Sequence, residues 1–251
     1  MQTGRKQHEI ETTGHMKKMT KTIGFGVACV GLLWATSASA IIITSASVGG
    51  ADVGAKHVNF DKLNSGDTGT LTGTGPDGSV SLQIDINAQV LKGSIGGVAA
   101  APYLSGNNGA GFESQSYPGA DETSYLTSGK TPSGKITMTF GGPQDYLGML
   151  WGSVDTYNTL QFFSGGTLGN LVGTVTGVNV NANVQGDQGI NGTYYVNMYS
   201  TVDFDTVVVT STQYAFEFDN VAYGNIPDGG TTLVLLGGAL SGLAFFRRKL
   251  D

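Results

Sequence analysis

Residues 79–90 read SVSLQIDINAQV, and this stretch decides the fold class. Apolar residues occupy every second position from Val80 to Val90, and polar residues occupy the positions between them. Successive side chains of a strand point to opposite faces, so a period of two predicts one long strand with a buried face and a wet face. We therefore expect a β-rich domain built around this strand.

Further short alternating stretches follow on both sides of it. Strands are predicted at 56–61, 135–140, 145–151, 157–163, 167–180, 193–200, 204–210 and 213–223, and 41–54 is a linker or a first edge strand. In the last predicted strand, Tyr214, Phe216 and Phe218 share one face. No stretch between 41 and 225 has the period of an amphipathic helix. This pattern predicts an all-β fold, a two-sheet β-sandwich of the jelly-roll type.

Two glycine motifs are interpreted as turns. Residues 73–78 read GTGPDG and fit the G-x-G-x-x-G pattern, but they precede a strand, whereas a dinucleotide-binding loop opens a helix. Pro-Asp-Gly favours a turn, so we predict a hairpin there. Asn191-Gly192 predicts a second hairpin turn, which we prefer to its other interpretation, with Thr193, as a glycosylation sequon.

The C-terminal segment has three parts. Ile226-Pro227-Asp228-Gly229-Gly230 forms a turn-like motif, residues 231–246 carry no charge and no proline, and Arg247, Arg248 and Lys249 follow. Sixteen residues make a helix of roughly 24 Å, a little short of the ~20 residues that usually span a bilayer. The basic cluster predicts a transmembrane helix with its end in the cytoplasm. The alternative is a buried core helix.

The N-terminal segment reads as a secretory signal peptide. Residues 1–15 show no structural pattern, which suggests an over-extended start with Met16 as the true first residue. Lysines follow Met16, residues 23–34 are apolar, and Ala38 and Ala40 form a small-x-small cleavage site. We predict a signal helix at 16–40 that is cleaved after Ala40. The alternative is an uncleaved anchor.

The C-terminal segment resembles the PEP-CTERM class of bacterial sorting signals, and it is closest to the variant that reads Val-Pro-Asp-Ser-Gly. Here Ile226 replaces the Val, and Gly229-Gly230 replaces Ser-Gly. The resemblance implies export by the secretion machinery, a transient stay in the inner membrane, and cutting near residues 226–230 by an exosortase. It also implies a final place at the cell surface or outside the cell, often alongside exopolysaccharide.

The domain left between these signals, residues 41–225, is acidic. From 41 to 227 there are five lysines, no arginine and fifteen carboxylates, for a net charge of −10. Such a surface repels nucleic acid, which binds proteins that neutralise its phosphates. The single cysteine, Cys29, lies in the signal peptide, which excludes disulfides and thiolate sites from the domain. Only His57 remains there, and we interpret it as a strand-edge residue.

A second resemblance concerns the domain itself. Residues 125–127, the stretch 144–160 with Trp151-Gly152-Ser153-Val154-Asp155, and the stretch 216–221 with Phe216-Glu217-Phe218-Asp219-Asn220 carry it. They resemble the core of exosortase-dependent surface proteins with a jelly-roll-like β-domain. The resemblance implies a fold and a location, and it implies no catalytic residue.

Three groups of residues are candidates for chemistry. The long loop 92–134 carries Tyr103, Phe112, Tyr117 and Tyr125, and its exposed tyrosines could stack on sugar rings. The alternative is that Tyr103 and Tyr125 hold the loop against the core. Carboxylates and an amide at predicted strand ends could hold a structural calcium ion; they are Asp155, Asp203, Asp205, Asp219 and Asn220. The alternative is that Asp155 and Asp219 accept backbone hydrogen bonds at turns. The glutamates that a glycosidase would need are Glu113, Glu122 and Glu217.

These observations favour a non-enzymatic surface or extracellular-matrix protein that associates with exopolysaccharide. We assign it no catalytic residue, no metal ligand and no cofactor beyond the calcium hypothesis. The alternatives are a carbohydrate-binding module that recognises one glycan and, below that, a glycoside hydrolase.

Overall fold

The structure is a computed structural model that describes residues 41–46, 49–112, 118–129, 134–181 and 183–226, and for 42–46 the backbone alone. All these residues belong to one compact unit. The elements are β1 (Ile41–Ala46), β2 (Lys56–Val58), β3 (Gly69–Thr74), β4 (Ser79–Ile84), β5 (Gln89–Lys92), β6 (Tyr103–Leu104), β7 (Gly119–Ala120), β8 (Ser124–Ser128), β9 (Ile136–Gly152), β10 (Asn158–Ser164), β11 (Asn170–Thr176), α1 (Gly177–Val180), β12 (Tyr194–Ser211) and β13 (Phe216–Gly224).

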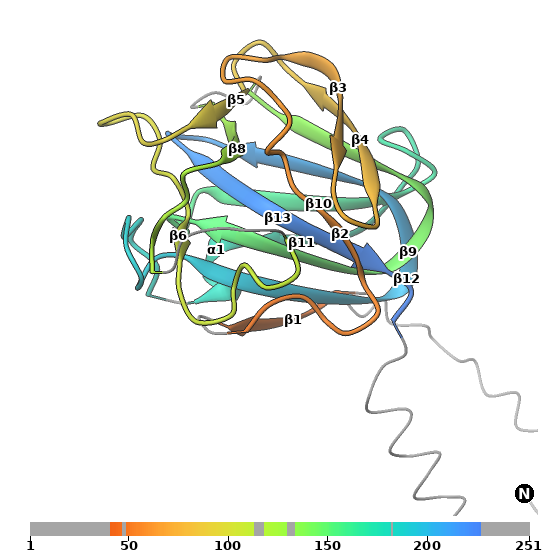
Figure 1. Ribbon diagram of the computed structural model, residues 1–251. Coiled ribbons are helices and arrows are strands. Elements are labelled where there is room, and N and C mark those ends of the chain that lie inside the picture. Colours follow the sequence, from red (N-terminus) through yellow and green to blue (C-terminus); the bar gives the residue numbers. More distant parts are fainter. Residues whose placement is uncertain (1–40, 47–48, 113–117, 130–133, 182, 227–251) are drawn as a thin grey trace, which may run out of the picture. The chain divides into compact units, whose positions relative to one another are not determined.

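Eleven strands form one antiparallel hydrogen-bonded sheet in the order β11-β10-β12-β9-β13-β8-β5 (Figure 1). Beyond this path β1 pairs with β12, β2 with β13, and β4 joins β3 to β9, while β6 and β7 form a separate two-stranded sheet. The prediction of an all-β fold is confirmed. The expectation of two separate sheets is wrong at the level of hydrogen bonding, because two long strands link both halves.

The long strands β9 and β12 explain this continuity. The start of β9 pairs with β4 and with the end of β12, whereas the end of β9 pairs with β13 and with the start of β12. The pairing of β9 with β12 shifts register between Tyr199 and Phe204, where the strands bend. The halves are here named layer A (β1, β2, β5, β8, β13, the end of β9 and the start of β12) and layer B (β3, β4, β10, β11, the start of β9 and the end of β12).

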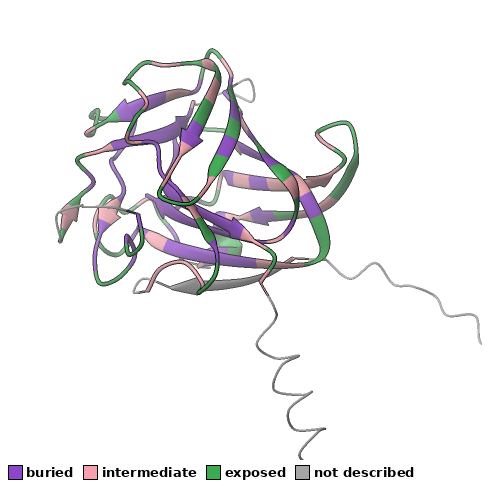
Figure 2. Ribbon diagram, turned by 45° about the vertical axis from the view of Figure 1, so that its right-hand side comes forward, coloured by how far each residue is buried: buried purple, intermediate pink, exposed green. Residues whose placement is uncertain are grey.

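The main hydrophobic core contains inward side chains from both layers, so the layers pack face to face. Layer B contributes residues such as Leu82 and Phe162, and layer A contributes Trp151, Phe216 and Phe218. Figure 2 shows the alternation along β4, where exposed and buried residues follow one another. The apolar face of each strand therefore points into one shared core.

The outer face of layer A is also covered. Residues of the long segment between β5 and β8, among them Leu104 and Phe112, pack on Tyr146, Leu150 and Tyr195. A second small cluster joins the same segment to Tyr125. Polar side chains on this outer face are consequently buried beneath loops, which places them in a candidate site.

The stretch 79–90 is not the single strand that its alternation predicts. It forms β4 and β5, and residues between them make a turn in which Ala88 N–H donates to Asp85 O at 2.9 Å. The chain crosses here from layer B to layer A, and Ile86 is 88% exposed. Because both layers face one core, Val80 to Ile84 and Ala88 to Val90 keep their alternate burial across the turn.

Other expectations were confirmed or corrected. Residues 73–78 form the predicted hairpin between β3 and β4. The predicted strands at 135–140 and 145–151 are one strand, β9, as are those at 193–200 and 204–210, and the stretch 167–180 ends in the helical turn α1. Asn191-Gly192 forms a turn but no hairpin, because no strand lies among the described residues between α1 and β12.

Several predictions concern residues outside the described part of the chain. These are the signal peptide with Ala38 and Ala40, the transmembrane helix at 231–246, the basic cluster 247–249 and all of the sorting motif except Ile226. Of the helices that the structure describes, none combines the length and the hydropathy needed to cross a bilayer.

Candidate functional site

Two of the stretches singled out in the sequence, 144–160 and 216–221, meet on neighbouring strands. The ring of Trp151 on β9 stacks on that of Phe216 on β13, with centroids 4.2 Å apart and an 11° interplanar angle. On the opposite face of the same strands, Ser153 Oγ donates to Glu217 Oε2 at 2.5 Å. Both stretches thus build one structural unit, apolar on the core side and polar on the loop side.

Glu217 lies at the centre of the polar side. It is 1% exposed, and its Oε1 accepts a hydrogen bond from Ala100 N at 2.9 Å. Burial raises the pKa of Glu217 to about 7, and the hydrogen bonds from Ser153 and Ala100 oppose that rise, while the charge of Asp155 adds to it. The carboxyl group is thus enclosed by loop and strand and half-protonated near neutrality.

Asn158 closes the corner between β9 and β10. Its Oδ1 accepts from the indole Nε1 of Trp151 at 3.3 Å and from Asp155 N at 2.9 Å, and its Nδ2 donates to Ala215 O at 2.9 Å. Tyr157 OH donates to Asp155 Oδ2 at 2.6 Å. Burial raises the pKa of Asp155, and this bond opposes the rise. These contacts are structural, and they fix the turn that holds Ser153.

The five oxygen-bearing candidates do not gather at one place. Asp203 is exposed. Asp205 accepts hydrogen bonds from Gly165 N at 2.7 Å and from Gly166 N at 2.9 Å, a role that the sequence did not predict for this residue. Burial would raise the pKa of Asp205, but those bonds outweigh it and lower the pKa. Asp219 and Asn220 are fully buried on β13, apart from the others.

Asp121 joins Asp219 there, and sequence reasoning missed it. It lies in the loop just before β8, is 1% exposed, and its Oδ1 accepts from Thr123 N at 2.8 Å and Thr123 Oγ1 at 2.5 Å. Nothing in the sequence marks it, since the loop has no periodicity and the partner strand is about a hundred residues away.

The aromatic candidates of the loop are mostly structural. Tyr125 and Phe112 are fully buried, and Tyr125 OH donates to Gly93 O at 2.8 Å, so Tyr125 holds the loop in place. Tyr103 is half-buried, and Tyr117 lies outside the described residues. His57 sits on β2 with its Nδ1 3.2 Å from Asp77 Oδ2, as expected of a strand-edge residue.

In the described part of the chain no second glutamate pairs with Glu217. Glu122 is exposed, and Glu113 lies outside the described residues. Among the residues that the structure describes, no three His, Cys, Asp or Glu side chains form a group that could hold a metal ion by themselves.

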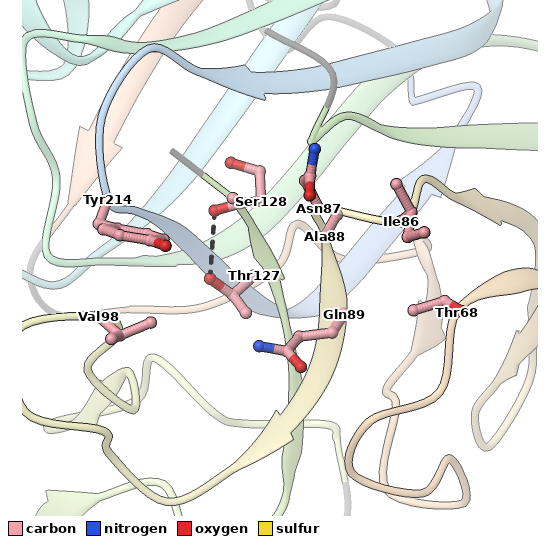
Figure 3. A pocket seen from close by; sticks show the side chains of 10 residues that line it. Thr68, Ile86, Asn87, Ala88, Gln89, Val98, Thr127, Ser128 and Tyr214 are labelled. Carbon is pink, nitrogen blue, oxygen red and sulfur yellow. Dashed lines mark hydrogen bonds between the residues drawn. The ribbon is translucent and has the colours of Figure 1, made fainter. Parts of the chain in front are cut away.

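A pocket of about 270 Å³ opens beside the start of β5 and the end of β8 (Figure 3). Tyr214 stands on one side, Ile86 and Thr68 on the other, and Gln89 and Thr127 lie between them. The lining is completed by Asn87, Ala88, Val98, Ser128 and Gly129. The described residues of this lining include no charged side chain, and they offer amides, hydroxyls and one aromatic ring.

Tyr214 was expected on the core face with Phe216 and Phe218, and that expectation is wrong. Phe216 and Phe218 are fully buried, whereas Tyr214 is 41% exposed. It precedes β13, so the alternation of the strand does not extend to it.

A family model described as VPDSG-CTERM motif matches residues 226–250. The chain carries a VPDSG-CTERM sorting signal. This match confirms the resemblance stated for the C-terminal segment, and it supports an exported protein that an exosortase sorts. No curated protein and no solved structure matches the chain.

Proposed function

We propose that this chain is a non-enzymatic surface or extracellular-matrix protein that is cut from its VPDSG-CTERM signal and associates with exopolysaccharide. The observation that carries the proposal is the place of the signal. The matched motif begins at Ile226, directly after the last strand, β13, ends at Gly224. Cutting within the motif would leave every strand of the domain intact.

The finer fold is part of this proposal. A jelly-roll-like sandwich is supported by the repeated crossing of the chain between layers A and B, at 85–88 and within both β9 and β12. A non-enzymatic role is supported by Glu217, whose carboxyl group is enclosed and hydrogen-bonded rather than presented to a cleft.

Intact mass of the protein from its native cell tests the processing. We expect a form that begins at Ile41 and ends near Pro227. A strain without the exosortase is the control, and it should retain Arg247 to Asp251. If the normal cell's product also retains these residues in its exported form, the proposal is refuted.

A second candidate function, recognition of a neutral glycan, is favoured by the pocket at β5 and β8. Ligand sites combine apolar surface with a few polar groups, and an aromatic face suits the C–H groups of a sugar. Tyr214 offers such a face beside Gln89 and Thr127, and the lining residues that the structure describes carry no charge. Tyr214 therefore replaces Tyr117 and Tyr125 as the residue proposed to stack on the sugar.

Glycan-array binding tests this candidate. We expect the unaltered protein to bind a neutral glycan and the variants Tyr214→Ala and Gln89→Ala to lose this binding. Tyr103→Ala is the matched control, since Tyr103 is a half-buried aromatic outside the pocket. Equal binding by all three variants would refute the pocket as the glycan site.

A further inference from the structure

Under the loop that covers layer A, acidic side chains from three distant parts of the sequence come together. Asp219 belongs to β13, Asp121 precedes β8, and Asp61 follows β2. Asp219 is 0% exposed and Asp121 is 1% exposed. The carboxyl groups of Asp121 and Asp219, here named the acid pair, are in contact, and the charge of Asp61 acts on Asp219 as well.

The acid pair lacks the hydrogen-bond donors that a buried carboxylate needs. Both carboxyl oxygens of Asp219 and the Oδ2 of Asp121 are buried, and among the described residues no hydrogen bond of normal geometry reaches them. The backbone N–H of Asn220 lies near enough to Asp219 to lower its pKa, but burial outweighs this effect. The next residue, Asn220, is also 0% exposed, and neither its Oδ1 nor its Nδ2 has a partner in this part of the chain. Leaving such groups unpaired in the interior is costly, so they indicate a missing ligand.

No basic side chain neutralises this charge. Among the described residues the ion pair is that of His57 with Asp77, and no lysine or histidine forms one with Asp121 or Asp219. Asp61 adds a further acidic group rather than a positive one, and its Oδ2 accepts a hydrogen bond from Asn59 Nδ2 at 3.0 Å. Two carboxyl groups in contact therefore share either a proton or a cation.

The number and kind of unpaired atoms favour a cation. One shared proton would serve two of the oxygens, and it would leave the other oxygen of Asp219 and the amide oxygen of Asn220 unsatisfied. A calcium ion takes six to eight oxygen ligands, including carboxylates, amide oxygens, backbone carbonyls and water. Among the described residues, no three acidic, histidine or cysteine side chains form a group that could hold a metal ion, so zinc is a poor fit. A calcium ion here would therefore take amide, backbone carbonyl or water oxygens in addition to the carboxylates.

A route to the acid pair exists. Asp121 also lines an open surface pocket of about 540 Å³, together with neighbours such as Lys92, Ala101 and Glu122. A hydrated cation can approach Asp121 from that side.

We propose that Asp121, Asp219 and the side-chain oxygen of Asn220 form a calcium site that ties the loop before β8 to strand β13. The ion would replace the missing donors with one positive centre. It would also fix the loop to the strand that precedes the sorting signal.

The processed protein from native cells, stripped with chelator and then dialysed, is the material for the test. We expect one calcium ion per chain by elemental analysis after reloading. With free calcium a hundred-fold above its Kd, the Tm should rise by about 5–10 °C, as a ligand that binds only the folded state requires. Magnesium at the same concentration should raise the Tm less.

Matched variants decide between the cation and the shared proton. Asp219→Asn and Asp121→Asn should lose the calcium-dependent rise in Tm, whereas Asp203→Asn, at an exposed carboxylate, should keep it. If the unaltered protein binds no calcium and its Tm does not respond, the pair shares a proton and the proposal is refuted.

Terbium luminescence tests the site in the unaltered protein, so it does not depend on whether the variants fold. Tyr125 and Tyr195 lie close enough to feel the charges of Asp121 and Asp219 respectively, so excitation of tyrosine should sensitise a terbium ion bound there. We expect sensitised emission from the unaltered protein that calcium displaces. Emission that calcium leaves unchanged, or no emission, would refute the site.

Discussion

Replacing Glu217 with Gln should make the β-domain more stable at neutral pH and leave it unchanged in acid. Glu217 is 1% exposed, and burial is the main cause that raises its pKa from 4.5 to about 7. The amide of Gln has the same shape and can still accept from Ala100 N. The amide Nε2 can donate to Ser153 Oγ once that hydroxyl turns to accept. The amide carries no charge at any pH, so the pH-dependent part of the difference between the two proteins is the cost of burying an ionised carboxylate.

The magnitude follows from the two pKa values. Each unit of difference between folded and unfolded states corresponds to about 1.4 kcal/mol, so the rise of Glu217 corresponds to about 3 kcal/mol. Because the folded-state pKa is raised, the stabilising contribution is fully present below pH 4.5 and is lost as pH rises through 7. Above pH 7 the natural protein therefore carries the full cost, and the variant does not.

Urea unfolding of both proteins between pH 4.5 and 8 measures this difference. We expect the free energy of unfolding of the variant minus that of the natural protein to rise by about 3 kcal/mol over this range. Glu122→Gln is the control, because Glu122 is exposed. A difference that stays constant from pH 4.5 to pH 8 would show that Glu217 is not the titrating group and would refute the reasoning.

Three further predictions test the fold. Gly192→Ala should destabilise the domain by about 3 kcal/mol, because the new Cβ would lie 1.7 Å from the backbone oxygen of Asp187. Gly141→Ala is the control in the same denaturation assay. It should cost less than about 0.5 kcal/mol, since a Cβ there meets nothing within 4 Å. Trp151→Phe should cost about 2 kcal/mol by urea unfolding, because buried ring volume and the indole hydrogen bond are both lost; an unchanged midpoint would contradict this. A fragment of residues 41–226 should unfold in one calorimetric transition, because these residues belong to one compact unit. The absence of any transition would show that the domain needs later residues to fold.

The sequence predicted the fold class well because alternation reports directly on one apolar face. It could not report the turn that lies within the alternating stretch 79–90. The pattern of 79–90 is the same for one long strand and for two strands in facing layers, since Ala88 and Val90 reach the same core as Val80. Only the exposure of Ile86 and the turn at Asp85 distinguish the two.

The polar side of layer A could not be predicted for a related reason. Glu217 and Asp219 alternate with Phe216 and Phe218, and that pattern predicts a wet outer face. The loop that buries this face has no periodicity, so its path, and the meeting of Asp121 with Asp219, follow from tertiary packing alone. The C-terminal signal was predictable because it is a contiguous motif that needs no fold.

The position of β13 in the sheet has a mechanical consequence. This last strand is hydrogen-bonded to β9 along one edge and to β8 and β2 along the other, and Ile226 N–H donates to Asp145 Oδ1 at 2.7 Å just beyond it. Tension applied through the C-terminus would load a strand gripped from both sides, so several ladder hydrogen bonds would have to shear together. A domain under tension at its C-terminus would therefore resist unfolding from that end.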